Sequence, residues 1–461
     1  ATSLLQMAYM EKTGALKRII IFVKTISSEN RAVQIMMINI GFGTLMVAVG
    51  ATPVSLLPPI LVAMGYSTYV AIALPAIGYD SLCTYALLGA PIVVFVDIAN
   101  SFLGKGNEIT LSQAGQVFFM FSPVVSTLIG FCMLWIVGKW KAVKEGLIPG
   151  ILTGIVITIV SYWTNKFDNL VVLTGVMCGM AVIVAMAIYL KLTGKKIIDK
   201  SKLSQEELEY EKKYSLLKVL SPWIILIILI LVLNIPKDMF NFLYRELKLP
   251  INGITANGKP LETRALWQAY TWIFVSIIVS FPFIKPKISE LKETWSIWIK
   301  RAPRPVFAAA IFFAMGEIMN MSGFSMETGQ FTTASMVKVL ADYSAFAFQG
   351  AYGYIVSFIG LFGGFITGSE ASTIAMFAKY TMTTAKNLSM PIIGLIIVTA
   401  GLAFGGGLAS VISPAKLQNA AASIDRIGEE NKVIRIAFVF SLILTLITSI
   451  FVGLLLWFKG I

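Results

Sequence analysis

The chain has 461 residues, of which 57% are hydrophobic and only 13% are charged, and its mean hydropathy is +0.81. Soluble domains carry about 25% charged residues, so this composition excludes a soluble fold and predicts an all-α polytopic membrane protein. The net charge of +13 does not indicate a nucleic-acid partner, because the Lys and Arg residues lie mostly in short loops between apolar runs, as in cytoplasmic loops of membrane proteins.

The residue types present restrict the chemistry. The chain contains no His, which excludes Ser-His and Cys-His catalysis and His-ligated metal or haem sites, so we expect neither an enzyme nor a cofactor. Cys83, Cys132 and Cys178 lie in apolar runs without metal-like spacing and are interpreted as packing residues. Residues 1–10 resemble the end of an apolar span, which predicts an N-terminally incomplete chain without a cleavable signal peptide.

In chain order, residues 11–32 are basic and are predicted to lie in the cytoplasm. Residues 33–97 form an apolar region that is too long for one span of about 20 residues. Gly, Thr, Ser and Pro residues interrupt it at 50–53 and again at 78–81. We therefore expect residues 1–97 to form a first repeat, which consists of a cytoplasmic connector, a re-entrant hairpin and a broken helix.

Residues 98–304 are predicted to hold intervening transmembrane helices. Loop 191–214 is rich in Lys and is expected to form a solvated cytoplasmic helix. Residues 287–300 carry four apolar side chains at helical spacing between basic residues, which predicts an amphipathic helix at the membrane interface. These four are Ile288, Leu291, Trp295 and Trp298.

Residues 305–461 are predicted to form a second repeat and a C-terminal helix. Region 350–412 is again long, apolar and broken. The basic loops imply that region 33–97 begins inside and ends outside, whereas region 350–412 runs the opposite way. Interrupted segments of opposite orientation predict an inverted-topology transporter, here with about eleven or twelve transmembrane segments. Alternatively, both regions are ordinary packed helices with small-residue faces.

The centre of the second region, residues 360–377, is apolar at both ends but polar in its middle. A break at membrane depth must be buried in protein or line a cavity. N-terminal ends of half-helices present N–H groups that suit a carboxylate, and small residues let it approach. We predict a substrate site built from Gly50, Thr52, Pro53, Ser81, Asn320, Thr367, Gly368, Ser369, Ser372, Thr373, Gly406 and Ser413.

Asp80 and Glu370 are the candidates for proton coupling, because a carboxyl group inside a membrane is costly and a partly dry one can exchange a proton near neutral pH. Both carboxyl groups could instead have a purely structural role. Asp80 could bond Ser81, Tyr79 or Thr84, and the Glu370 head could reach a polar loop. Three lysines could pair with substrate or with these acids, or could simply extend to the interface: Lys379, Lys386 and Lys416.

The chain resembles the L-lactate permease family, which carries lactate and glycolate across bacterial inner membranes with protons. The resemblance covers nearly the whole chain, and family members carry further N-terminal spans. Their grouping with other ion transporters implies a homodimer that works by an elevator-like motion. The blocks that carry the resemblance are 10–31, Thr52-Pro53-Val54, 61–66, Gly89-Ala90-Pro91-Ile92, Met319-Asn320-Met321-Ser322-Gly323, 367–372, and 405–414 followed by Arg435.

Departures from the family pattern fall at functional positions. The family's acidic residue before the first Gly-rich motif falls at Leu45, and its lysine ahead of Ile-Ser-Pro falls at Ser410. Its Asn or Asp in the second motif is Glu370 here. The resemblance therefore implies a divergent member in which an anion is held differently and another acid serves coupling.

The leading hypothesis is a secondary active transporter in the bacterial inner membrane that imports a small monocarboxylate, L-lactate or a similar 2-hydroxy acid, by proton symport. The alternatives are a carrier of another small organic anion coupled to sodium, and an anion channel. An intramembrane aspartyl protease is disfavoured, because it needs two carboxylates that share a proton and the chain has no Gly-x-Gly-Asp motif.

Overall fold

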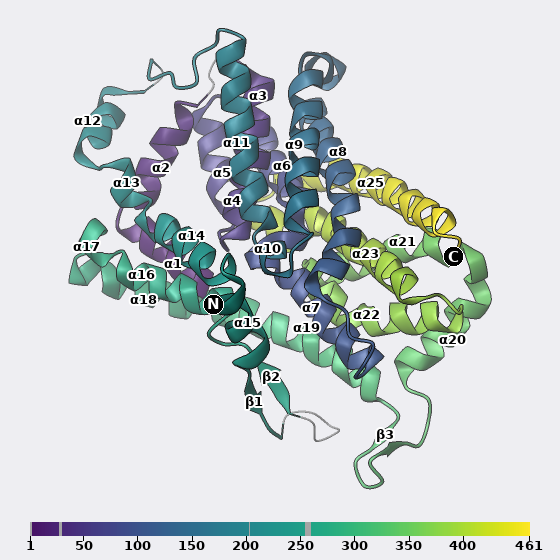
Figure 1. The fold of residues 1–461 in the computed structure, drawn as a ribbon. Coiled ribbons are helices and arrows are strands. Elements are labelled where there is room, and N and C mark those ends of the chain that lie inside the picture. The colour runs from purple at the N-terminus through teal and green to yellow at the C-terminus, as the bar shows by residue number, and fades with distance from the viewer. Residues whose placement is uncertain (1, 27–29, 202, 254–259) are drawn as a thin grey trace.

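A computed structural model describes residues 2–26, 30–201, 203–253 and 260–461, with all their side chains except those of Asp80, Leu261, Ser410 and Ala415. Within these residues the fold is almost entirely helical, and each of its two sheets is a two-stranded antiparallel hairpin (Figure 1). The expected all-α architecture is confirmed.

The first quarter of the chain contains the two interruptions that the sequence predicts. One separates α4 from α5, where Gly50 has a φ of +87°. The other follows α6, where a 3-10 helix leads into α7 through Leu87, Leu88 and Gly89, all with positive φ. The elements are α1 (Thr2–Lys12), α2 (Ala15–Lys24), α3 (Arg31–Ile35), the π-helix Met36–Phe42, α4 (Gly43–Ala48), α5 (Pro53–Ala63), α6 (Thr68–Gly78), the 3-10 helix Tyr79–Tyr85 and α7 (Ala86–Leu103).

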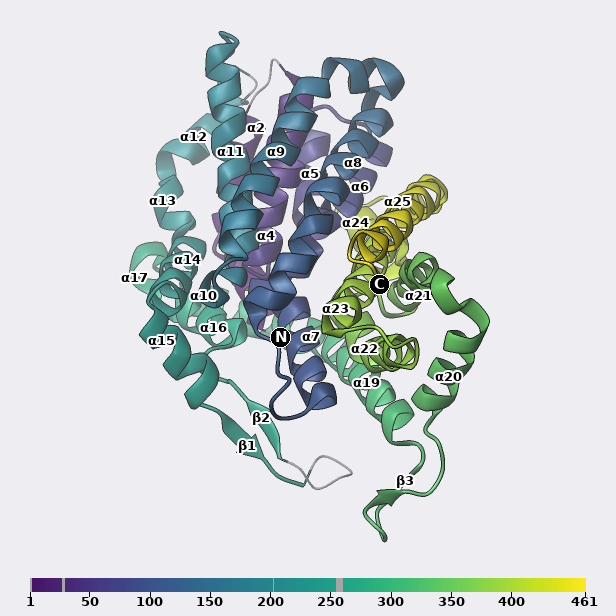
Figure 2. The same ribbon diagram turned by 45° about the vertical axis from the view of Figure 1, so that its right-hand side comes forward.

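Long apolar helices follow, and α8, α9 and α11 stand side by side in Figures 1 and 2. The longest of them, α8, has non-helical dihedrals at Gly138 and Lys139, so its last turns form a separate piece. The elements are α8 (Leu111–Glu145), α9 (Leu147–Thr164), α10 (Asp168–Val171), α11 (Thr174–Leu192), α12 (Gln205–Lys213), α13 (Leu216–Val219) and α14 (Ser221–Asn234).

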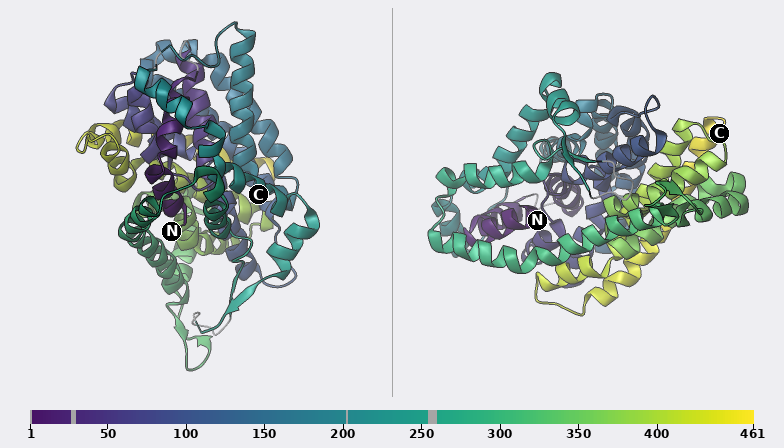
Figure 3. Two further views of the ribbon diagram at one scale, coloured as in Figure 1. Left: turned by 90° about the vertical axis from the view of Figure 1, so that its left-hand side faces the viewer. Right: turned by 90° about the horizontal axis from the view of Figure 1, so that it is seen from below.

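The next segment carries both β-hairpins. Figure 3 shows α18 and α19 running along one side of the molecule, from near the N-terminus to the C-terminal helices. The elements are α15 (Lys237–Asn241), the π-helix Phe242–Glu246, β1 (Leu249–Ile251), β2 (Leu261–Thr263), α16 (Ala269–Val279), α17 (Phe281–Ile284), α18 (Ile288–Arg301), α19 (Pro303–Met321), β3 (Phe324–Ser325) and β4 (Gln330–Phe331).

The last third of the chain forms a helical group, coloured green to yellow, on one side of α8 (Figures 1 and 2). Its elements are α20 (Met336–Phe348), the 3-10 turn Gln349–Ala351, α21 (Tyr352–Thr367), α22 (Glu370–Asn387), α23 (Ile392–Ala409), the 3-10 turn Ser410–Ile412, α24 (Pro414–Ala422) and α25 (Glu430–Phe458).

Within the described residues, nine helices are long and apolar enough to cross a membrane, or ten if α14 and its 90° bent continuation count as one span. Three shorter apolar helices accompany them: Pro53–Ala63, Thr68–Gly78 and Ala269–Ile284. Two of these short helices belong to the first interrupted region, where half-helices were expected. The polytopic membrane class is thereby confirmed, while the repeat arrangement stays a prediction.

Glycines bring α21 and α23 into backbone contact. A Cβ at Gly360 would collide with the carbonyl of Leu402, and one at Gly364 would collide with the carbonyl of Gly406. Such close packing of small residues is how helices associate when lipid supplies no hydrophobic drive. Helix α21 is therefore held in a fixed relation to α23.

Helix α12, in segment 191–214, has no buried residue, but it is bonded to the N-terminal connector. It begins with a capping box, Ser204 and Glu207. Three ion pairs join it to α2: Lys17–Glu206, Lys24–Glu207 and Arg18–Glu211. The Arg18 side chain is only 5% exposed, so this junction is partly desolvated.

Candidate functional site

The second long apolar region, residues 350–412, is interrupted between α21 and α22; this interruption is called the second break, and the one at residues 50–53 the first-half break. Helix α21 ends because Gly368 adopts φ +65°, a left-handed conformation that glycine adopts readily. Ser369 is extended and caps α22, and its hydroxyl accepts a hydrogen bond from the Ser372 N–H. The Thr373 hydroxyl donates to the Ser369 carbonyl at 2.9 Å and lies 3.1 Å from the Thr367 hydroxyl. The break is therefore a structured polar turn inside an apolar hairpin.

Glu370 is the first residue of α22 and is only 2% exposed. The Thr84 hydroxyl donates to its Oε1 at 2.6 Å. A Cβ at Gly407 would lie 2.8 Å from its Oε2, so the glycine leaves the space that this oxygen uses. A carboxylate in the first turn of a helix is stabilised by the N–H groups there. Glu370 thus joins the second break to segment Tyr79–Tyr85 of the first half.

Segment Tyr79–Tyr85 presents polar groups toward three helices. Ser81 is fully buried, and its hydroxyl lies 3.1 Å from the Thr44 hydroxyl on α4. The Ser126 hydroxyl of α8 donates to the Ser81 carbonyl at 2.5 Å. Leu82 has non-helical dihedrals, φ −140° and ψ 43°. The Ser126 bond satisfies one carbonyl of a backbone that has left the regular helical pattern inside the membrane protein.

Helix α23 and the following helix α24 are also separated by an interruption, and both lie against the polar turn between α21 and α22. A Cβ at Gly406 would lie 2.9 Å from the Thr373 Cβ, and one at Gly368 would lie 2.9 Å from the Ser413 Oγ. Ser413 immediately precedes α24, which begins at Pro414. Nine of the predicted site residues are thus gathered around Glu370: Ser81, Thr367, Gly368, Ser369, Ser372, Thr373, Gly406, Ser413 and Glu370 itself.

The first-half break, at residues 50–53, packs against α7 and α16. A Cβ at Gly50 would meet Leu87 at 2.8 Å and Ile273 at 3.1 Å. Thr52 and Pro53 begin α5. Among the described residues, no side-chain hydrogen bond links this break to the neighbours of Glu370. The Asp80 side chain, like that of Ser410, lies outside the described part of the chain.

Asn320 lies on α19, which packs against α22; a Cβ at Gly316 would lie 2.7 Å from the Ala375 carbonyl oxygen. Asn320 is 9% exposed, and within the described residues its Oδ1 has no hydrogen-bond partner. An unsatisfied buried amide oxygen is uncommon and calls for an explanation.

Three polar residues near the breaks were not selected from the sequence. Thr84, considered only as a partner for Asp80, bonds Glu370, and Thr44 bonds Ser81. Asn39 is 1% exposed on the π-helix Met36–Phe42, and neither amide atom has a partner among the described residues. Short π-helices recur at functional sites. The sequence could have indicated Asn39 only through its position as a single amide in an apolar run.

The three lysines of the second half differ in their surroundings. Lys416 lies with its Nζ 3.7 Å from the ring centroid of Tyr79, beside the first-half segment. Lys379 pairs with Glu317 at 3.5 Å, and Lys386 lies 5.9 Å from the Phe102 ring. Lys416 is therefore the member of this set that lies against segment Tyr79–Tyr85.

The described part of the chain contains no group of three His, Cys, Asp or Glu side chains that could hold a metal ion, and its cysteines are free thiols. The site offers hydroxyl groups, glycine backbone and a carboxyl group that can bind a proton. These groups can recognise a small polar solute, and broken helices at membrane depth are a feature of carriers. The fold and site thus define a polytopic membrane transporter.

The family model described as L-lactate permease matches residues 2–458. The L-lactate permease of Escherichia coli K12 is 22% identical over 95% of this chain and 80% of its own length. Glycolate permease GlcA of the same organism is 22% identical (92% and 78%), and the L-lactate permease of Halalkalibacterium halodurans is 21% identical (93% and 79%). No solved structure matches the chain.

The chain therefore belongs to the L-lactate permease family. As a permease it is a transporter and not an enzyme, and as a bacterial family member with many apolar helices it is a multi-pass protein of the inner membrane. The resemblance inferred from the sequence blocks is confirmed.

Proposed function

We propose that this protein is a secondary active transporter that imports a small monocarboxylate, L-lactate or a similar 2-hydroxy acid, by proton symport. The main support for the proposal is the burial of the Glu370 carboxyl group. This residue is 2% exposed and is bonded to Thr84 where two interrupted helical regions meet. A symporter needs a buried group that binds a proton together with the substrate. The names of its relatives, L-lactate permease and glycolate permease, point to 2-hydroxy acids as the substrate class.

Helix starts support an anionic substrate. Helices α5, α22 and α24 begin at Pro53, Glu370 and Pro414, next to three of the proposed substrate residues. Each helix start carries partial positive charge, which favours a carboxylate. We assign substrate binding to the twelve residues predicted from the sequence, and proton coupling to Glu370 and Asp80.

We further propose that residues 1–97 and 305–461 form inverted repeats around the intervening segment 98–304. Each repeat has one interrupted helix pair, α4 with α5 and α21 with α22, followed by a second interrupted element. In this scheme helix 287–300 lies at the cytoplasmic interface, and the protein works as a homodimer with an elevator-like motion.

Uptake into proteoliposomes tests the proposal. Labelled L-lactate should accumulate when the lumen is more alkaline than the outside, and the rate should saturate with substrate. Sodium dependence at constant pH would instead favour the sodium-coupled alternative. A non-saturating conductance would favour the anion channel. No accumulation of lactate, glycolate or other short monocarboxylates under any ion gradient would refute the proposal.

The substrate class is testable by binding alone. A panel of short carboxylates added to the purified protein should raise its Tm only for those that bind the folded state, by mass action. We expect 2-hydroxy acids to give the largest shift. A larger shift with dicarboxylates or with uncharged hydroxy compounds would contradict the assignment.

A further inference from the structure

A groove of about 690 Å³ lies between the ends of four helices and is lined by none of the proposed site residues. Its walls come from the loop before α8, the first turns of α8, the end of α9, the start of α23 and the end of α25. It therefore bridges α8 and α9 to the C-terminal helical group. A volume of this size with largely apolar walls is poorly matched to a small carboxylate.

The floor of the groove is hydrocarbon. Four isoleucines from two successive turns of α23 line it, facing Val117, Phe119 and Met120 of α8 and Leu455 of α25. Ile392, at the open end, is 39% exposed. Because α8, α23 and α25 are all long and apolar enough to span a membrane, this floor lies where lipid chains are available.

The rim of the groove is charged and aromatic. Lys166, Lys459 and Glu108 line it. The Lys166 Nζ lies 4.0 Å from the Tyr162 ring centroid and 4.5 Å from that of Trp163. Trp163 is 55% exposed and Trp457, beside Lys459, is 69% exposed. Exposed Trp and Tyr rings with lysines at helix ends mark the level of lipid headgroups.

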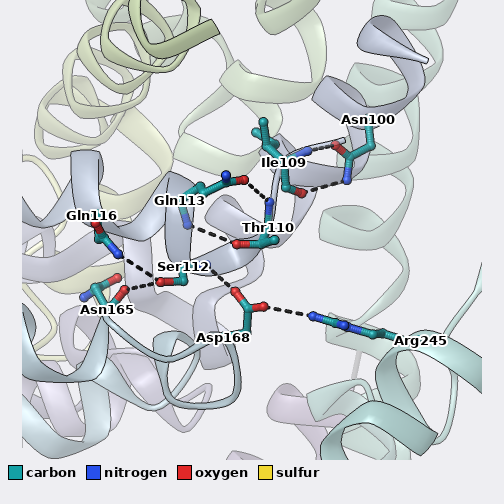
Figure 4. A network of polar contacts seen from close by, with 9 residues as sticks. All are labelled: Asn100, Ile109, Thr110, Ser112, Gln113, Gln116, Asn165, Asp168 and Arg245. Carbon is teal, nitrogen blue, oxygen red and sulfur yellow. Dashed lines mark hydrogen bonds and ion pairs between the residues drawn. The ribbon is translucent and has the colours of Figure 1, made fainter. Parts of the chain in front are cut away.

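Hydrogen bonds hold the rim in shape (Figure 4). The Asn100 side chain bonds both backbone groups of Ile109, at 2.7 and 3.0 Å, which fixes the loop that carries Glu108. The Ser112 hydroxyl donates to the Asn165 carbonyl at 2.9 Å, next to Lys166. The backbone next to Glu108 and Lys166 is thus held in place, which lowers the ordering cost of binding.

We propose that this groove binds one phospholipid whose headgroup carries a phosphate and a primary ammonium, as in phosphatidylethanolamine. The phosphate lies against Lys166 and Lys459, the ammonium against Glu108, and one acyl chain along the isoleucines of α23. This headgroup, with one negative and one positive charge, matches a rim of two cations and one anion. The bound lipid links α8 to α23 and α25 and stabilises their packing.

Native mass spectrometry of the detergent-purified full chain tests this assignment. Phosphatidylethanolamine, phosphatidylglycerol and phosphatidylcholine are offered in equal amounts. Wild-type protein should retain one phosphatidylethanolamine in preference to the others, with a higher Tm in its presence. The double variant Lys166→Gln/Lys459→Gln should bind it about tenfold more weakly, since two charged contacts to phosphate are lost. Lys432→Gln, an exposed lysine at the other end of α25, should bind like wild type.

Two further variants keep the proposal testable if the double variant does not fold. Glu108→Gln should abolish the preference over phosphatidylglycerol while leaving phosphate-dependent retention. Ile392→Trp should block the groove and reduce retention of all three lipids. Equal retention of the three lipids by wild-type protein would overturn the proposal. So would a preference for phosphatidylglycerol, or a Glu108→Gln variant with unchanged selectivity.

Discussion

Replacement of Glu370 by Gln tests the coupling role of this residue with little change in shape. The Gln side chain keeps an oxygen that can accept the 2.6 Å hydrogen bond from Thr84, but it cannot bind a proton. Hydrogen bonds to a charged group contribute about 1.5–3 kcal/mol and neutral ones about 0.5–1.5 kcal/mol, so the variant should lose about 1–1.5 kcal/mol of stability. It should therefore fold, and a transport defect can be assigned to the missing proton site.

The expected magnitude follows from the stoichiometry of one proton per anion. A difference of one pH unit is equivalent to about 1.4 kcal/mol, so it supports about tenfold accumulation of lactate by the wild-type protein. The Glu370→Gln variant should show no accumulation above equilibrium. It should still exchange labelled for unlabelled lactate across the membrane, because exchange requires no net proton movement.

Proteoliposomes with an imposed pH gradient measure both quantities on the same preparation. Full pH-driven accumulation by Glu370→Gln would move the coupling role to Asp80. Accumulation by the double variant Glu370→Gln/Asp80→Asn would refute the reasoning that either carboxyl group couples transport to protons.

Three further variants test a helix contact, a buried amide and an ion pair. Gly364→Ala should lower the Tm, because its Cβ would collide with the Gly406 carbonyl and overpacking costs about 1–3 kcal/mol; Gly350→Ala, which meets no atom within 4 Å, is the control. Asn39→Leu should raise the Tm, since an unsatisfied buried amide costs about 1–3 kcal/mol, and should slow uptake if the amide serves transport; unchanged uptake would make Asn39 a structural residue. Burial raises the pKa of Glu207, but the Ser204 N–H and the Lys24 ammonium outweigh it and lower the pKa overall. The bonds of the Glu207 carboxylate with Ser204 and Lys24 therefore stabilise the folded state at neutral pH, and this stabilisation is lost as the pH falls through the lowered pKa. The Tm deficit of Glu207→Gln should therefore disappear well below about pH 4.3, and a deficit that persists there would contradict the ion-pair explanation.

Composition and hydropathy were sufficient to predict the membrane class, and glycines with hydroxyl residues marked the breaks at 50–53, 78–81 and 367–369. Those features are local, because a glycine with positive φ or a Ser cap acts within one turn of chain. The capping box of Ser204 and Glu207 is equally local. Its docking onto α2 was not predicted, since charged segments normally face water and the partner helix is about 180 residues away in the sequence.

Which residues surround Glu370 depends on packing between segments that are distant in the sequence. Glu370 and Thr84 are 286 residues apart, and only the fold brings them together. The sequence indicated that both halves contribute to the site, but it paired the second break with residues 50–53. The described hydrogen bonds join the second break to segment Tyr79–Tyr85, and its pairing with residues 50–53 stays a prediction. A pattern of small residues identifies where a helix can break, but it does not specify which other break lies beside it.

The Glu370 side chain has the length that its hydrogen bond with Thr84 requires. An Asp side chain is shorter by one methylene, so its carboxyl group would withdraw by about 1.5 Å and lie about 4 Å from the Thr84 hydroxyl, beyond hydrogen-bond range. The longer Glu side chain fits because Gly407 has no Cβ where its second oxygen lies. The length of the Glu370 side chain thus depends on both Thr84, which bonds one oxygen, and Gly407, which leaves space for the other.

This dependence predicts the outcome of a double-mutant cycle. Thr84→Val should lower the stability of the wild-type protein by about 1.5–3 kcal/mol, because it removes a hydroxyl bonded to a buried carboxylate. In the Glu370→Asp background the same change should cost little, since the bond is already broken there. The two changes should therefore be strongly non-additive when unfolding is measured, as expected for groups in contact. Additive effects would show that Glu370 is held by other groups and that its length is unrelated to Thr84.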